Sequence, residues 1–344
     1  MALVGTINAS NDFGLKNRII NGAMVIDQRN AGTAVTVNGA YPVDRFLVGE
    51  DTTGAYSGQR DSSAPVGFVN SLKFTTTTAD ASIAAGEVCF LRQFVEGTNV
   101  SDLAWGTASA KSVTLSFWVK SSLTGSFSGA IANDGYNRSY PFLYTIAVAD
   151  TWEYKTVTIP GDTTGTWLTT TGIGLRIYWN LGTGTDNTGT AGAWVGAGNV
   201  GADSTVAVIG TLNATFYITG VQLEKGSTAT SFDYRPYGTE LALCQRYYFQ
   251  ISTLASITGF AFTAAATNEA MGSGTFPVTM RANPTVTTFN SSGISGGANV
   301  YGTGDITGVT AGRITLDTWT SVVKTAGWSV GQIISGTYSA SAEL

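Results

Sequence analysis

The stretch Val113–Val119 reads VTLSFWV and alternates apolar with polar or bulky side chains. Leu115 and Phe117 fall on one face and Trp118 on the other, because successive side chains of a β-strand point to opposite faces. The same alternation recurs in residues 175–181 and 216–219. The pattern predicts half-buried strands.

Turn-forming residues separate these strands, as in 161–165 and 182–187. The 43 glycines and only 7 prolines fit many short strands joined by tight turns. Strands without intervening helical periods favour antiparallel sheets packed as a sandwich. Because 344 residues exceed what one hydrophobic core usually serves, we expect two domains.

One segment departs from the period of two. Thr239 is suited to cap a helix whose first turn holds Glu240, and apolar side chains recur at helical spacing up to Tyr248. The predicted order is an N-terminal arm at 1–16, a sandwich at 17–236, a connecting helix at 237–250 and a C-terminal β domain at 251–344.

Composition excludes several function classes. The chain has no histidine, which rules out Ser/His/Asp catalysis and imidazole-bound metals. Cys89 and Cys244 are too few for a disulfide scaffold, and we expect both to be buried and reduced. A charge of −5 without a basic block argues against a nucleic-acid partner. With neither a signal peptide nor a long apolar run, we expect a cytoplasmically made chain with no membrane partner, cofactor or metal.

The C-terminal domain is poor in charge. Its charged residues are Glu269, Arg281, Asp305, Arg313, Asp317, Lys324 and Glu343. A small domain with so few charges is expected to have much of its surface covered by other chains, which predicts a homo-oligomer. The alternative is that Thr, Ser and Asn side chains keep it in solution.

Two groups of segments carry a resemblance. They are residues 17–29 and 41–46 near the start, and 216–226, 229–237 and 240–248 near the end, continued by 276–284. Together they resemble the opening and closing segments of a tailed-bacteriophage virion protein family, whose members are similar to carbohydrate-binding-module jelly rolls followed by a small β domain. The resemblance implies an all-β, jelly-roll fold, a virion location, a trimer by analogy and an arm that docks onto other virion proteins.

A structural role is predicted for four charged residues in these segments. Asp44, Arg45, Asp233 and Arg235 are suited to join the ends of the domain through charge-assisted hydrogen bonds. The Asn21–Gly22 pair and Gly220 mark places where the backbone bulges or approaches another strand closely.

Glycan binding needs aromatic faces and planar polar groups. The candidate contacts are Arg176, Tyr178 and Asn180 on one predicted strand, Tyr136, Asn137 and Arg138 in a predicted loop, and Trp194. The alternative for each is sheet surface, subunit contact or loop anchoring.

The sequence therefore predicts a bacteriophage virion structural protein, not an enzyme: a short fibre, spike or decoration protein with host-surface glycan as candidate ligand. The alternative is a free carbohydrate-binding adhesin or a capsular-polysaccharide-degrading enzyme. Such an enzyme needs only two carboxylates, and no spacing here selects a pair.

Overall fold

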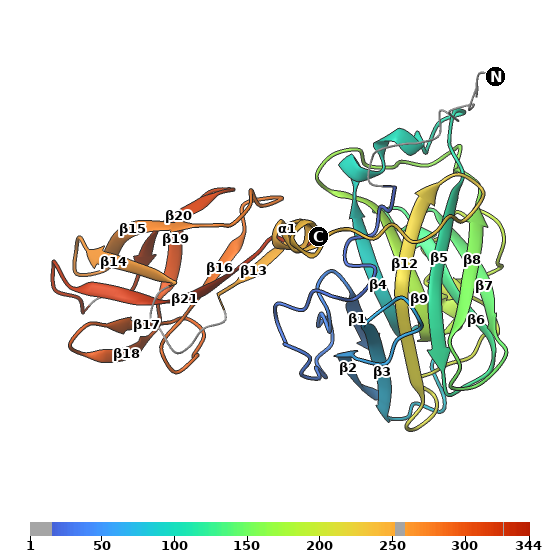
Figure 1. Ribbon diagram of the computed structural model, residues 1–344, viewed down its shortest axis with the longest axis horizontal. Helices are drawn as coiled ribbons and strands as arrows, with labels where there is room; N and C mark the ends of the chain where they lie inside the picture. The colour runs from blue at the N-terminus through green and yellow to red at the C-terminus, as the bar shows by residue number, and fades with distance from the viewer. Residues whose placement is uncertain (1–15, 252–258, 326) are drawn as a thin grey trace, which may run out of the picture. The chain divides into compact units, whose positions relative to one another are not determined.

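The computed structural model describes residues 16–251, 259–325 and 327–344 (Figure 1). The chain forms two compact units. Of the described residues, the first unit holds those up to Val25 together with Gly32–Pro42 and Phe46–Arg235. The second unit holds Ile26–Ala31, Val43–Arg45 and the described residues from Pro236 onward. The predicted arm lies outside the described residues except for Lys16.

The first unit is a sandwich of two antiparallel sheets within the described residues. One sheet has the order β1 (Leu47–Asp51), β4 (Val88–Glu96), β9 (Ile173–Thr183), β6 (Gly125–Ala132) and β7 (Ser139–Ile146). The other has the order β2 (Ala55–Asp61), β3 (Ser71–Thr78), β12 (Thr215–Lys225), β5 (Val113–Ser121) and β8 (Glu153–Ile159). Short elements complete it: η1 (Gly97–Asn99), η2 (Ser101–Leu103), η3 (Thr185–Asn187) and the parallel pair β10 (Thr188–Gly189) and β11 (Gly201–Ala202). The predicted all-β, jelly-roll fold class is confirmed.

The core lies between the two sheets. Phe117 of β5 is fully buried and packs edge to face on Trp179 of β9, with ring centroids 5.8 Å apart. Its other edge-to-face partner is Tyr144, at 5.2 Å. Trp118, the next residue along β5, faces outward, so the predicted alternation is confirmed for this strand.

The first described residues run beside β12. Arg18 N donates to Leu223 O at 2.9 Å, and Asn17 Nδ2 donates to Val221 O at 3.0 Å. A Cβ on Gly22 would lie 2.1 Å from Val221 O. Only glycine lets the two segments approach this closely.

β12 is irregular at the same level. Its register against β5 shifts between Thr219 and Gln222, which confirms the bulge predicted at Gly220. Just beyond the strand, Asp233 Oδ2 accepts from Asn17 N at 3.3 Å. Arg235 donates to Asn17 O and, at 3.0 Å, to Ile19 O. These bonds connect the two ends of the sandwich. The sequence predicted this position for Asp233 and Arg235.

The second unit combines a helix with a sheet centred on one strand. The helix α1 is Tyr237–Gln245, and β21 (Ile333–Ser341) pairs with four other strands. The remaining strands are β13 (Tyr248–Gln250), β14 (Phe260–Ala264), β15 (Glu269–Thr275), β16 (Thr285–Phe289), β17 (Gly297–Val300), β18 (Gly304–Thr307), β19 (Thr310–Ile314) and β20 (Thr318–Val323). Trp319 is fully buried at the centre, 5.0 Å from Phe260 and 5.1 Å from Tyr338 between ring centroids.

The helix differs in detail from the prediction. Pro236, not Thr239, occupies the N-cap position, and Thr239 N donates to Pro236 O at 2.9 Å. The helix ends at Gln245 because the chain then extends into β13, which pairs with β21. Tyr248 is therefore a strand residue.

Asp44 and Arg45 belong to the second unit, although the sequence placed them at the ends of the first domain. Arg45 pairs with Glu343, and its guanidinium carbon lies 3.5 Å from the Tyr247 ring centroid. Asp44 is fully buried and accepts a hydrogen bond from Gln28 N at 3.0 Å. Burial raises the pKa of Asp44. The partner Glu343 is 298 residues away, which is why local pattern did not reveal it.

Cys89 and Cys244 are free and buried, as expected. Burial raises the pKa of both thiols. No helix in the described part of the chain is long and apolar enough to span a membrane.

Substitution of Gly22 by Ala tests the close approach to β12. The added Cβ overlaps Val221 O, so we expect the free energy of unfolding to fall by about 1–3 kcal/mol or more. Urea denaturation measures it. Gly196→Ala is the matched control, because a Cβ there meets nothing within 4 Å. An equal effect of both substitutions would contradict this account of Gly22.

Candidate functional site

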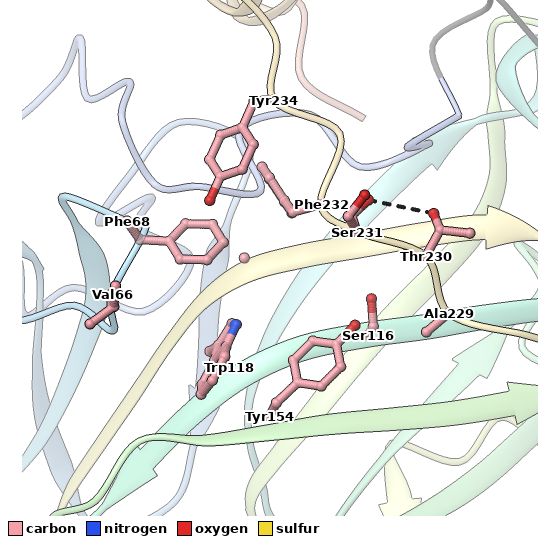
Figure 2. Close-up of a pocket in the computed structure, with 11 residues that line it drawn as sticks. Val66, Phe68, Ser116, Trp118, Tyr154, Ala229, Thr230, Ser231, Phe232 and Tyr234 are labelled. Atoms are coloured by element: carbon pink, nitrogen blue, oxygen red, sulfur yellow. Dashed lines mark hydrogen bonds between the residues drawn. The ribbon is translucent and has the colours of Figure 1, made fainter.

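An open groove lies on the outer face of the sheet that contains β12 (Figure 2). It encloses about 620 Å³. We call it the aromatic groove; its lining residues are Val66, Phe68, Ser116, Trp118, Tyr154, Gly220, Ala229, Thr230, Ser231, Phe232 and Tyr234.

Two neighbouring strands supply one wall. Trp118 of β5 stands directly opposite Tyr154 of β8, and their ring centroids are 5.4 Å apart. Ser116 lies two residues before Trp118 and therefore on the same face. Tyr154 is 43% exposed, so its ring offers an accessible apolar surface next to that of Trp118.

Gly220 forms the floor. Its φ is +61°, and a Cβ there would lie 2.7 Å from Phe68 Cζ and 3.1 Å from Trp118 Cδ1. The bulge in β12 thus places bare backbone between two aromatic side chains. A side chain at this position would fill the groove.

The opposite wall is an aromatic cluster formed by Phe68, from the connection between β2 and β3, and by Phe232 and Tyr234, which follow β12. The Phe68 and Phe232 ring centroids are 5.1 Å apart, and those of Phe232 and Tyr234 are 4.8 Å apart. The Tyr234 hydroxyl donates to Gly67 O at 2.8 Å, which fixes its ring. Each ring therefore holds a neighbour in place, so the wall is preformed.

None of the described residues that line the aromatic groove is charged. Two hydrogen bonds fix the Thr230 side chain. Its hydroxyl donates to Glu224 Oε2 at 2.7 Å and accepts from Lys16 Nζ at 2.9 Å. Among the described residues, the indole N–H of Trp118 has no hydrogen-bond partner. The groove therefore offers two accessible rings and an unused donor, a combination suited to an uncharged, partly apolar ligand.

The residues predicted on β9 are buried. Arg176 is 8% exposed, Tyr178 1% and Asn180 2%. Val200, from the connection between β9 and β12, packs against Tyr178. The expected half-buried strand is thus covered on both faces.

Their polar groups are used inside the fold. Arg176 pairs with Asp134 and donates to the Tyr136 hydroxyl at 2.9 Å. The Tyr178 hydroxyl also donates to that of Tyr136 at 2.9 Å, which brings three of the predicted residues together. Asn180 donates to Ser128 Oγ at 3.1 Å, away from the other three.

The other predicted residues hold loops together. Asn137 Oδ1 accepts from Asn133 Nδ2 at 2.7 Å. Arg138 pairs with Asp162, and its guanidinium carbon lies 5.9 Å from the Trp194 ring centroid. Trp194 packs against both Trp105 and Trp167, at 5.3 and 5.4 Å between ring centroids, in a cluster that its local sequence did not reveal. Glycan contact by these residues stays a prediction.

Sequence reasoning did not select the aromatic groove, although signals for it were present. The alternation in β5 already turned Trp118 and Ser116 away from the core. Phe232 and Tyr234 lie in one of the segments that carry the resemblance. What joins these two signals is the strand pairing of β5 with β12, which a single sequence does not show.

No family model and no curated protein matches the chain. Similar solved structures include the enzymatically active domain of tailspike protein 4 of bacteriophage CBA120, at 12% identity and a TM-score of 0.31, over 61% of this chain and 21% of that one. A CBM4 structure matches at 17% identity and 0.29, over 60% and 98% of the two chains. The family 11 carbohydrate-binding module of a Clostridium thermocellum cellulase matches at 13% and 0.29, over 58% and 99%. Similarity this low does not assign a ligand to this chain.

Asp162 tests the loop-anchoring role of Arg138. Burial by itself raises the pKa of Asp162, but hydrogen bonds from Arg138 and Trp167 outweigh it and lower the pKa from the usual 3.8. The carboxylate therefore stabilises the fold above pH 3.8, and this stabilisation is lost as the pH falls through the lower folded-state pKa.

Asp162→Asn should lower the free energy of unfolding by about 1.5–3 kcal/mol at pH 7, with the deficit shrinking at pH 3. Urea denaturation at both pH values checks this. Asp51→Asn, at an exposed position, serves as control. A deficit as large at pH 3 as at pH 7 would show that the charge of Asp162 is not the cause.

Proposed function

We propose that the chain is a glycan-binding virion protein whose aromatic groove binds an uncharged saccharide. The observation that carries this proposal is the pair formed by Trp118 and Tyr154, which present adjacent accessible rings in a groove without charged lining residues. The C–H face of a sugar ring packs on such rings, and its hydroxyls bond to nearby donors and acceptors.

The groove has the polar groups that this ligand needs. Thr230 and Ser231 are exposed at one rim, and Trp118 supplies an indole N–H. Because neither wall contains a carboxylate, the groove has no general acid or base of the kind that glycosidases use. Binding rather than hydrolysis is therefore proposed for this groove.

A virion location is proposed from the resemblance of the segments around residues 17–46 and 216–248. Many copies on one particle would turn weak single-site affinity into strong attachment. The alternative, a free adhesin or a polysaccharide-degrading enzyme, differs in location and turnover. Mass spectrometry of purified virions discriminates them: stoichiometric presence supports the structural role, whereas absence from virions supports the alternative.

Trp118→Ala should weaken binding of neutral oligosaccharides about tenfold, since the lost stacking is worth ~1 kcal/mol or more. Isothermal titration calorimetry measures the affinity, which should vary little with salt because the contacts are uncharged. Trp152→Ala is the matched control: this partly buried tryptophan lies outside the groove, 6.2 Å from the Tyr217 ring centroid. Equal affinities of the two variants would refute the assignment of the groove.

Homo-oligomerisation through the second unit is also proposed. Tyr301 and Ile333 are 80% and 46% exposed and adjacent, because Tyr301 N donates to Ile333 O at 3.0 Å. Val330, close by in sequence, is 71% exposed. Such surface is buried at low desolvation cost because few ions lose water.

The double substitution Tyr301→Asp and Ile333→Asp should dissociate the oligomer, proposed to be a trimer, while leaving each subunit folded. Light scattering on the full chain at tens of micromolar reads the mass. Leu212→Asp, at a 55% exposed position of the first unit, controls for added charge. A wild-type monomer under these conditions would rule out the proposal.

A further inference from the structure

Arg92 lies on the outer face of the other sheet and has no counterion among the residues that the structure describes. It lies on β4, directly opposite Tyr178 of β9. Its guanidinium carbon is 4.2 Å from the Phe94 ring centroid and 5.2 Å from that of Phe90. The two rings hold the side chain in place by cation–π contacts.

The charge of Arg92 is not neutralised by any described residue. Its Nε is buried without a hydrogen-bond partner, and no carboxylate of the described residues pairs with it. Nearby arginines differ: Arg176 pairs with Asp134, and Arg138 pairs with Asp162. A partly buried cation without a counterion raises the free energy of the folded chain, and binding of an anion lowers that free energy again.

The surroundings add a positive field. The guanidinium carbon of Arg176 lies 4.8 Å from the same Phe94 ring and 4.1 Å from the Tyr136 ring. Because Asp134 already balances Arg176, the surplus charge belongs to Arg92. Tyr136 is 44% exposed and offers a ring beside it.

We propose that Arg92 binds the carboxylate of an acidic sugar, while the aromatic side chains around it contact the sugar ring. A guanidinium matches a planar carboxylate with two parallel hydrogen bonds, which distinguishes this group from a neutral hydroxyl. The inference rests on the proposed function in taking a glycan as ligand. Its site, however, is on the sheet opposite to the aromatic groove.

The test compares uronic-acid oligosaccharides with their uncharged methyl esters. The probes are oligomers of galacturonate, glucuronate and mannuronate, measured by calorimetry with the full chain at low and moderate salt. We expect binding of at least one acid, at least tenfold weaker binding of its ester, and a loss of affinity as salt rises.

Arg92→Gln should lower the affinity for the acid about 10- to 100-fold, and Arg92→Lys should lower it less, because lysine keeps the charge but loses the planar fork. Arg313→Gln removes the same charge from a 58% exposed side chain in the second unit and should change nothing. Urea denaturation should give Arg92→Gln a midpoint no lower than that of the wild-type chain, which shows that lost binding is not lost folding.

Two results would overturn the proposal: no binding of any of the three acids by the wild-type chain, or equal binding of acid and ester. Inorganic sulfate competing at the same concentration as the sugar acid would also overturn it, since the site would then hold a simple anion. Trp118→Ala separates this inference from the proposed function, because it should weaken neutral binding about tenfold and leave binding of the acid unchanged.

Discussion

The close approach of Gly22 to the carbonyl oxygen of Val221 is the constraint on which the first unit depends. The contact fixes the first described residues against β12 at the point where that strand bulges. The bulge therefore contacts the first described residues on one side and the aromatic groove on the other. On one side it receives Asn17, whose Nδ2 donates to Val221 O, and Arg235 in turn donates to Ile19 O. On the other it presents Gly220 as a bare floor between Phe68 and Trp118. The geometry that closes the sandwich therefore also shapes the aromatic groove.

The two outer faces of the sandwich differ because of what covers them. Val200 and Tyr136 lie over the β9 face, so Tyr178 is buried there with its hydroxyl already bonded. Among the described residues, no comparable segment covers Trp118 and Tyr154 on the other sheet, where the pocket is open. The strands thus determine which side chains face outward, and the connections determine which of those reach solvent. Among the described residues of the covered sheet, Arg92 keeps a charge without a counterion beside the Phe90 and Phe94 rings.

The same distinction explains how far the sequence could predict the structure. The alternation of side chains in the sequence correctly predicted that Phe117 and Trp118 lie on opposite faces of β5. It also predicted the fold class, because strand periodicity is local. It failed for Arg176, which bonds to Tyr136 in the loop after β6, and for Asn180, which bonds to Thr205 in the connection after β9. It also failed for Arg45, whose partner Glu343 is nearly the whole chain away. The candidate glycan contacts were selected by residue type, whereas the pairing of strands determines which of these residues lie close together.

Sites on opposite faces have a geometric consequence for attachment. The two sheets of a sandwich are about 10 Å apart, so the aromatic groove and Arg92 cannot contact the same sugar residue. One unbranched saccharide chain would have to pass around the edge of the sandwich to contact both sites. The two proposed sites therefore predict binding of separate glycan segments, one neutral and one acidic. In an oligomer, the number of segments held scales with the number of subunits, and affinity rises by effective concentration rather than by new contacts.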